Sequence, residues 1–113
     1  MEPFILQKKA EILLNQLIYP MLVHFPKAEK FSLCQELKQS CYRVIHLSIQ
    51  YTTALKRDRG SLLRKADTEL KYLLVLVGVA REQRYITEKK ALHLQRSISE
   101  LGRICGGLLK SNL

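Results

Sequence analysis

Apolar residues recur at helical spacing in four long stretches of this chain, and only three short breaks separate the stretches. A period of three to four residues favours amphipathic helices, and no stretch shows a strand-like alternation that resists a helical interpretation. We expect the first helix from about Phe4 to His24, with Pro20 interrupting its hydrogen-bond ladder and kinking it near Gln16 to Tyr19. The sequence therefore predicts an all-α fold.

Turn and capping signals place the next boundaries. Phe25-Pro26 ends the first helix, because the residue before a proline is disfavoured in the α region. Ser32 and Gln35 have the spacing of a capping box, in which each side chain accepts a hydrogen bond from a free N–H group. This pattern predicts a second helix that runs to about Lys56.

The remaining two breaks define the last two helices. The second break is expected from Asp58 to Ser61, whose residue types are typical of turns, with Ser61 capping the third helix. The third break runs from Arg84 to Ile86, after which Thr87 caps a last helix that ends at about Lys110. Because breaks this short leave consecutive helices side by side, the sequence predicts an antiparallel up-down-up-down four-helix bundle.

The third helix carries more apolar surface than one bundle can cover. Every residue from Leu73 to Val79 is apolar or glycine, whereas a helix inside a single bundle buries one face. The excess predicts a contact with a partner subunit or another protein, in which we place Leu73 and Leu76. The β-branched residues of this segment leave a buried strand as the alternative.

Glycines in the last helix indicate a second contact. Gly102 and Gly106 lie one turn apart on one face, although a glycine inside a helix costs about 1 kcal/mol relative to alanine. Small residues four apart let another backbone approach closely, so we expect a tight helix contact within the chain or between its copies. Arg103 adjoins this face, and we expect it to have a structural role, paired with Glu100 or with a neighbouring helix.

Length and cysteine content indicate one reduced domain. A chain of 113 residues can form its own core, and we assign residues 1–113 to a single domain. The cysteines are odd in number and lie within helical patterns, so we expect reduced thiols in the core rather than disulfides. They are Cys34, Cys41 and Cys105.

The chain is strongly basic. Its 19 Lys and Arg residues against 10 Asp and Glu residues give a formal net charge of +9 and a pI near 9.7. Such a surface favours polyanions, with nucleic acid first and an anionic membrane or an acidic protein second. The longest apolar runs fall far short of the ~20 residues of a membrane-spanning helix. The N-terminus lacks the layout of a signal peptide, which predicts a cytoplasmic protein.

Side chains suited to catalysis are few. His24, His46 and His93 fall on three different helices, and none has a carboxylate or thiol one turn away with which to form a metal-ligand pair. The sequence also contains neither a glycine-rich phosphate loop nor cysteines at zinc spacing. We therefore expect no enzyme activity, no metal and no cofactor.

Clustered cations are the candidate nucleic-acid contacts. The first five of them surround the second break, and the others follow on the third helix or at its end: Lys56, Arg57, Arg59, Arg64, Lys65, Lys71, Arg81 and Arg84. At the other end of the bundle, Lys27 and Lys30 are expected near Arg81, Arg84 and their neighbours. Because few aromatic residues are interleaved, we expect phosphate contacts rather than base stacking. The alternative is a solvated surface that charge keeps soluble.

Several short motifs in a fixed order carry a family resemblance. They are Tyr19-Pro20, Phe25-Pro26-Lys27, Phe31-Ser32-Leu33, Lys71-Tyr72-Leu73-Leu74 and the glycine-containing segment from Glu100 to Leu109. With these motifs the chain resembles, from about Tyr19 to Ser111, the accessory variability proteins (Avd) of diversity-generating retroelements. More distantly, it is similar to the four-helix proteins encoded in intervening sequences of bacterial large-subunit ribosomal RNA genes.

The resemblance implies a function that the residues alone do not. It implies a homopentameric helical barrel with a basic surface, which binds the retroelement's reverse transcriptase and its structured RNA and supports mutagenic cDNA synthesis. Val75 stands where the family commonly has a basic residue, which leaves Lys71 as the better RNA candidate on the third helix. A scaffold that binds only protein, and a protein of the ribosomal intervening-sequence type, are the alternatives.

Overall fold

The computed structural model describes residues 4–111, which form four helices and no strand. The elements are α1 (Ile5–Ile12), the π-helical η1 (Leu13–Ile18), α2 (Tyr19–Leu22), the short 3-10 helix η2 (Lys27–Glu29), α3 (Leu33–Thr53), α4 (Lys56–Glu82) and α5 (Glu88–Ser111). The first three follow one another without a break and make the first helix of the bundle. The predicted all-α, four-helix fold is confirmed, and the strand alternative for 73–79 is wrong because the segment lies within α4.

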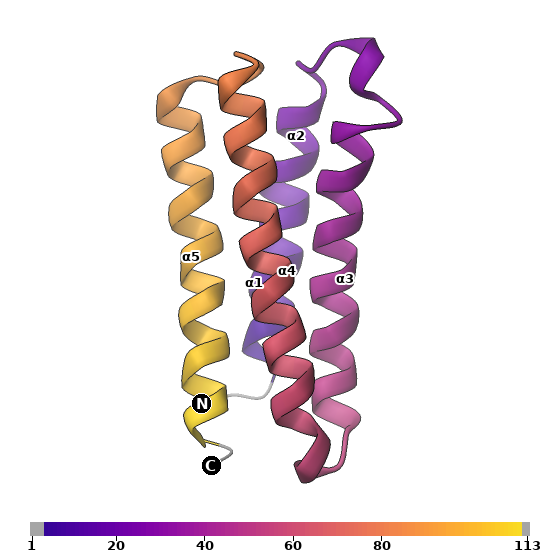
Figure 1. Cartoon of the computed structure of the whole chain (residues 1–113), viewed down its shortest axis with the longest axis vertical. Coiled ribbons are helices and arrows are strands. Elements are labelled where there is room, and N and C mark those ends of the chain that lie inside the picture. Colours follow the sequence, from indigo (N-terminus) through magenta and orange to yellow (C-terminus); the bar gives the residue numbers. More distant parts are fainter. Residues whose placement is uncertain (1–3, 112–113) are drawn as a thin grey trace.

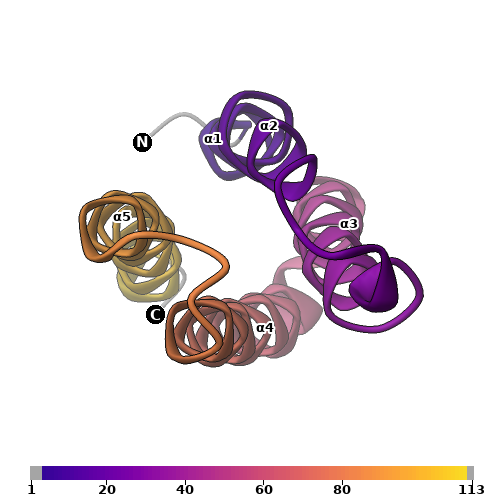
Figure 2. The same ribbon diagram turned by 90° about the horizontal axis from the view of Figure 1, so that it is seen from above.

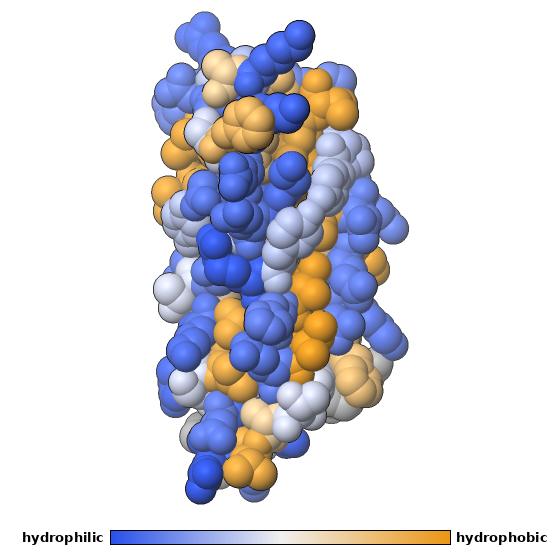
Figure 3. Space-filling view, turned by 90° about the vertical axis from the view of Figure 1, so that its right-hand side faces the viewer, coloured by the Kyte–Doolittle hydropathy of each residue, from blue (hydrophilic) through white to orange (hydrophobic). Residues whose placement is uncertain are grey.

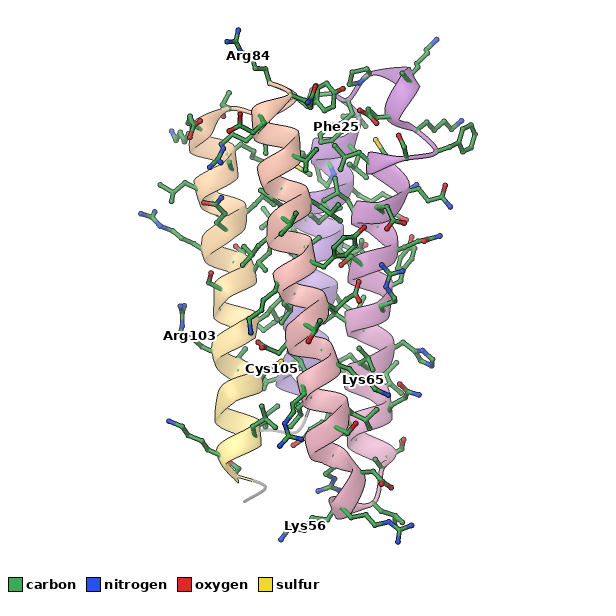
Figure 4. All side chains as sticks on the ribbon, viewed as in Figure 1. Phe25, Lys56, Lys65, Arg84, Arg103 and Cys105 are labelled. Carbon is green, nitrogen blue, oxygen red and sulfur yellow. The ribbon has the colours of Figure 1, made fainter. Side chains whose placement is uncertain are left out.

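The four helices surround one elongated core (Figures 1 and 2). The molecule measures 43 × 25 × 19 Å along its principal axes. The first helix contacts α3 and α5, and α4 contacts both of these as well, so each helix has two neighbours. Phe25 and Arg84 lie at one end of the molecule, and Lys56 lies at the other (Figure 4). Within the described residues, none of the helices has the length and apolarity needed to cross a membrane.

Every helix contributes fully buried side chains to the core. They include Leu6, Ile18, Leu37, Leu63, Leu73, Leu94, Ile98 and Leu101. The three cysteines are free and buried among them, as the sequence predicts. Burial raises the pKa of the Cys41 thiol to about 12 and that of Cys105 to about 12, because a thiolate is poorly solvated in an apolar interior.

Pro20 is accommodated by the π-helical turn that precedes it. In an α-helix the proline ring clashes with the carbonyl group four residues back, and the missing N–H group leaves that carbonyl without its donor. Here the backbone N–H of Tyr19 donates to the carbonyl of Leu14, five residues back. The helical path continues through the proline, and Ile18 before it and Met21 after it are both buried.

The predicted turn from Asp58 to Ser61 is wrong, because these residues lie inside α4. The chain reverses instead at Ala54 and Leu55, whose ψ angles of 155° and 149° are extended. Arg59 stabilises this connection, since its Nε donates to the carbonyl of Ala54 at 3.3 Å and its guanidinium lies 5.8 Å from the ring centre of Tyr51. With these interactions the second break lies closer to the N-terminus than the predicted one.

One of the other predicted caps is wrong and one is confirmed. Ser32 precedes α3, but its hydroxyl donates to Glu29 Oε1 at 2.5 Å and caps no backbone N–H group of the helix. The hydrogen bond to a charged carboxylate is strong, and it holds the Ser32 side chain where its oxygen accepts no N–H group of α3. At α5, by contrast, Thr87 Oγ1 accepts a hydrogen bond from the backbone N–H of Lys90 at 3.1 Å.

Two alanine substitutions test these boundaries against each other. Thr87→Ala removes a helix cap and should lower the free energy of unfolding by about 1 kcal/mol. Ser61→Ala replaces an exposed serine within a helix and should leave stability unchanged or raise it by a few tenths of a kcal/mol. Urea unfolding followed by circular dichroism measures both. Equal destabilisation by the two substitutions would restore Ser61 as a cap and contradict the observed second connection.

Candidate nucleic-acid interface

The end of the bundle at which α3 connects to α4 presents two exposed cations. Lys56 and Arg57 occupy the first turn of α4, and the side chain of Arg57 is 80% exposed with only a 3.8 Å contact to Asp58. Cations at a helix N-terminus oppose the helix dipole by about 0.3–1 kcal/mol each. Arg59 differs from them, because its contacts with Ala54 and Tyr51 use the side chain within the fold. Lys56 and Arg57 are therefore open to a ligand, whereas the Arg59 side chain is already engaged.

Arg64 and Lys65 lie along a shallow groove between α3 and α4. The groove has a volume of about 520 Å³, and its lining also includes Leu47, Thr68 and Glu69. Both cations are exposed, and neither forms an ion pair with a residue of the described part of the chain. They extend the basic surface from the α3–α4 connection onto the side of the bundle.

Two predicted contacts are partly neutralised by carboxylates. Lys71 Nζ lies 2.7 Å from Asp67 Oδ2, and this hydrogen bond raises the pKa of the Lys71 ammonium. Arg81 contacts Glu82 at 3.7 Å and Glu88 at 3.9 Å, and its side chain is only 34% exposed. Both remain cations, but they are weaker candidates for phosphate binding than the unpaired ones.

The first and third connections meet at the opposite end, as the sequence predicts. Tyr85 makes the junction: its hydroxyl donates to Glu29 Oε2 at 2.8 Å, and its ring lies 5.3 Å from that of Phe25. The Glu29 carboxylate also accepts a hydrogen bond from the Ser32 hydroxyl. The two hydrogen bonds hold the pKa of Glu29 below its ordinary value, and the one from Ser32 has the larger effect. We call this region, formed by residues 23–32 and 83–87, the joined end.

Arg84 adopts a backbone conformation that favours glycine. Its φ is 64°, and it follows α4 at the position where the chain leaves the helix. The N–H of Arg84 donates to the carbonyl of Arg81, and the N–H of Tyr85 donates to that of Ala80, each at 2.9 Å. These are the bonds of a Schellman motif, in which a non-glycine residue costs roughly 1–2 kcal/mol. The Arg84 side chain points away from the bundle (Figure 4).

A cavity of about 670 Å³ opens beside Arg84. Apolar residues and Tyr85 form much of it, and basic groups stand around them; the lining is Pro20, Met21, His24, Arg84, Tyr85, Ile86, Thr87 and Lys90. An apolar site surrounded by cations suits an anionic ligand that has a flat or apolar part. The joined end thus carries a shaped cavity that is a candidate site for an anionic ligand.

Lysines and aromatic rings gather on the other side of the joined end, which the sequence analysis missed. Lys30 Nζ lies 5.4 Å from the ring centre of Phe31, and Lys38 Nζ lies 5.8 Å from that of Tyr19. Tyr19 and Tyr42 are hydrogen-bonded through their hydroxyl groups, a contact that raises the pKa of Tyr42. These residues are far apart in the sequence, so the only local signal was Lys30 beside Phe31.

The residues predicted for assembly divide into buried and open ones. Leu73 is fully buried and Leu76 is 7% exposed, so both belong to the core of the single chain and are unavailable to a partner. A Cβ atom added to Gly106 would meet nothing within 4 Å, and one added to Gly102 would meet only Asp67 Oδ1 at 3.8 Å. The described residues therefore show no close helix approach at these glycines, and a contact between copies stays a prediction. Arg103 is exposed and points outward (Figure 4).

Arg103 also does not make the ion pair that was considered for it. Glu100 Oε1 instead lies 2.8 Å from Lys9 Nζ of α1. Arg103 has no ion-pair partner among residues 4–111, and it adds to the exposed cations on the side of the bundle.

Two apolar strips remain uncovered on the surface of the bundle. On α4, Tyr72, Val75 and Val79 are 37%, 61% and 41% exposed. On α3, Tyr42 and Ile49 are 45% and 42% exposed, with half-buried Ile45 between them. An apolar strip along the α3 side of the molecule is visible in Figure 3. Each strip follows the three-and-four spacing of one helix face.

Histidines and acidic residues do not converge on any point of the described chain. Residues 4–111 contain no group of three His, Cys, Asp or Glu side chains that could hold a metal ion. His24 lies at the cavity beside Arg84, while His46 and His93 are exposed on α3 and α5.

Replacing Arg84 with glycine tests whether the left-handed backbone at this position lowers the stability of the fold. Arg84→Gly relieves the left-handed backbone and should raise the free energy of unfolding by about 0.5–1 kcal/mol, while it removes an exposed charge. Arg84→Lys keeps both the charge and the backbone cost, and should match the wild type. Thermal unfolding measures the difference, and a glycine variant less stable than the wild type would show that the Arg84 side chain itself stabilises the fold.

The chain was compared with known protein families, curated proteins and solved structures. A family model described as bAvd-like matches residues 4–112. No curated protein and no solved structure gives a match. The family match spans all four helices, including the first, which extends the resemblance noted from Tyr19 onward. The chain therefore belongs to the bAvd-like family.

Proposed function

We propose that this chain is a non-enzymatic accessory subunit of a diversity-generating retroelement. It binds the element's reverse transcriptase and its structured RNA through its basic surface, and supports mutagenic cDNA synthesis in the cytoplasm. Membership of the bAvd-like family and the net charge of +9 support this proposal.

The observation that carries the RNA-binding proposal is the set of cations that no carboxylate neutralises. Two carboxylates are bound by tyrosine hydroxyls rather than by cations: Tyr72 donates to Glu36 at 2.6 Å, and Tyr85 donates to Glu29 at 2.8 Å. The cations without an ion pair to any residue of the described chain include Lys27, Lys30, Lys38, Lys56, Arg64, Lys65, Arg84, Lys89, Lys90, Arg96 and Arg103. They occupy both ends and the sides, so an RNA of some length can contact several at once.

The mechanism is electrostatic positioning. Lys and Arg side chains neutralise phosphates of the folded RNA and release the cations condensed on them, which fixes the RNA on the bundle without reading its sequence. The same subunit contacts the polymerase, so the template is held close to the site of cDNA synthesis. None of these steps requires a reacting side chain of this chain.

We propose that the chain is an up-down-up-down bundle that assembles into a homopentameric ring. The two uncovered strips support this proposal. In a closed ring each subunit contacts its two neighbours through two different surface patches, so each subunit needs two separate interaction surfaces. The strip of Val75 and Val79 on α4 and the strip of Ile45 and Ile49 on α3 meet that requirement. The open space over Gly106 allows a neighbouring helix to approach α5 in the same assembly.

Salt dependence of RNA binding tests the proposed function. The probe is the RNA transcribed from the DNA beside the gene for this chain. The logarithm of the binding constant should fall linearly with the logarithm of the salt concentration, with a slope of about 0.7–0.9 per phosphate contact. Lys90 lines the cavity beside Arg84, so the double substitution Arg84→Gln and Lys90→Gln should weaken binding and flatten this slope by about 1.5.

A matched control removes two cations that are already ion-paired. Arg43 pairs with Glu69 at 2.8 Å and Lys71 pairs with Asp67 at 2.7 Å, so Arg43→Gln with Lys71→Gln changes the net charge equally but should flatten the slope less. A different result would be that the folded chain binds this RNA no better than an uncharged polymer and still captures the reverse transcriptase encoded beside its gene. That result would contradict RNA binding and favour a scaffold that binds only protein.

Oligomer mass tests the assembly. Light scattering after gel filtration should give five times 13.1 kDa for the wild type. Val75→Glu places a charge in the α4 strip and should reduce the mass, whereas Gln50→Glu on an exposed position of α3 should not. Gly106→Leu should stabilise the helix by up to about 1 kcal/mol but block assembly. A wild type that stays monomeric at micromolar concentration would end the pentamer proposal.

A further inference from the structure

Phe31 stands out from the surface of the joined end. Its side chain is 81% exposed, and it lies between η2 and α3. Single exposed apolar residues are common and carry no meaning alone. The surroundings of Phe31 are what distinguish it: a lysine ammonium over its ring, and hollows lined by lysines, amides and tyrosines beside it.

The backbone around Phe31 is held so that the ring faces outward. On one side, the Ser32 hydroxyl and the Tyr85 hydroxyl both donate to the carboxylate of Glu29, at 2.5 Å and 2.8 Å. On the other side, Leu33 and Cys34 are buried in the core with 8% and 7% exposure. The segment is thus fixed at both ends, and the exposed ring is pre-organised for a ligand rather than free to fold inward.

The hollow next to Phe31 combines the groups that recognise a nucleotide. It has a volume of about 370 Å³ and is lined by Lys30, Phe31, Gln35, Lys38, Gln39 and Tyr42. The Phe31 ring offers a face for stacking, the two glutamine amides can donate to and accept from a base edge, and the two lysines can hold phosphates. Lys30 and Lys38 also line a second hollow of about 290 Å³, together with Tyr19 and Lys27.

Electrostatics favours a polyanion over a protein partner here. Lys27, Lys30 and Lys38 form no ion pair with any residue from 4 to 111. The nearby carboxylates of Glu29 and Glu36 accept hydrogen bonds from hydroxyl groups instead. Lysine is depleted at protein–protein contacts, whereas lysines around an exposed aromatic ring are the combination that binds single strands.

We propose that Phe31 and Lys30 of the joined end, together with Lys38 of the adjoining α3, bind unpaired nucleotides, with one base stacked on Phe31 and the adjoining phosphates on the two lysines. The inference rests on the proposed RNA-binding function and specifies where single-stranded segments of the nucleic acid contact the chain. It adds a stacked base to the phosphate contacts that the sequence predicts. Paired RNA, whose bases are stacked internally, contacts the same lysines without using the ring.

The experiment compares two probes with four proteins. The probes are a single-stranded oligouridine and a blunt, fully paired RNA duplex with the same total number of nucleotides. Phe31→Ala should weaken binding of the single strand by about 10-fold, the loss typical of one stacked base, and leave binding of the duplex unchanged. Phe31→Tyr retains a stacking face and should bind like the wild type, while Phe31→Leu retains apolarity only and should behave like alanine.

The salt slope separates stacking from charge. Phe31→Ala should lower single-strand affinity without changing the slope, because no phosphate contact is lost. Lys30→Gln with Lys38→Gln should flatten the slope by about 1.4, or 0.7 per contact on a single strand. Circular dichroism checks folding, which these exposed and half-buried positions should leave intact.

Three results would overturn the inference. If Phe31→Ala binds both probes like the wild type, the stacking platform is wrong while the proposed RNA-binding function stands. If the substitution weakens capture of the polymerase but not of the single strand, the surface binds protein instead. If the wild type binds neither probe nor the RNA from beside its gene, the proposed function fails and the platform fails with it.

Discussion

The side chain of Tyr85 joins the two connections at one end of the bundle, and the proposed binding surface depends on this contact. Its ring packs against Phe25 and its hydroxyl donates to Glu29, which ties the connection before α3 to the connection before α5. The Glu29 carboxylate then holds Ser32, and so orients Phe31. On the other side, Arg84 is placed at the mouth of a cavity by the backbone bonds that end α4. The Tyr85 side chain thus supports the ring proposed for stacking, and the backbone N–H of the same residue helps to place Arg84.

Stability and binding place opposite demands on this surface. Arg84 occupies a backbone conformation suited to glycine, Phe31 leaves its ring in water, and Lys56 and Arg57 begin a helix where the dipole disfavours cations. Features that break local rules without a compensating contact are expected at functional sites. The core shows none of them: its apolar residues are closely buried, and its thiols are protected from ionisation by burial. These features lie at the two ends, where some of the proposed RNA contacts also lie.

Much of the fold could be predicted from the sequence, because the helical periodicity of a buried stripe is a local signal. The Thr87 cap, the buried thiols and the meeting of the first and third connections all follow from that signal. The second connection could not be predicted, since an Asp-Arg-Gly-Ser segment is typical of turns and only the contacts of Arg59 with Ala54 and Tyr51 draw it into α4. The aromatic part of the site was hidden for a related reason: its members come together only when the helices pack.

Photochemical cross-linking of the chain to its RNA, followed by mass spectrometry of the attached peptides, tests the central claim most directly. If the joined end is the site of nucleic-acid contact, bases should cross-link to the peptide that contains Phe31, and deletion of the Tyr85 hydroxyl by Tyr85→Phe should reduce that product by loosening Glu29. Cross-links confined to the region of Lys56 and Arg57, with none at Phe31 in a fully folded protein, would contradict it.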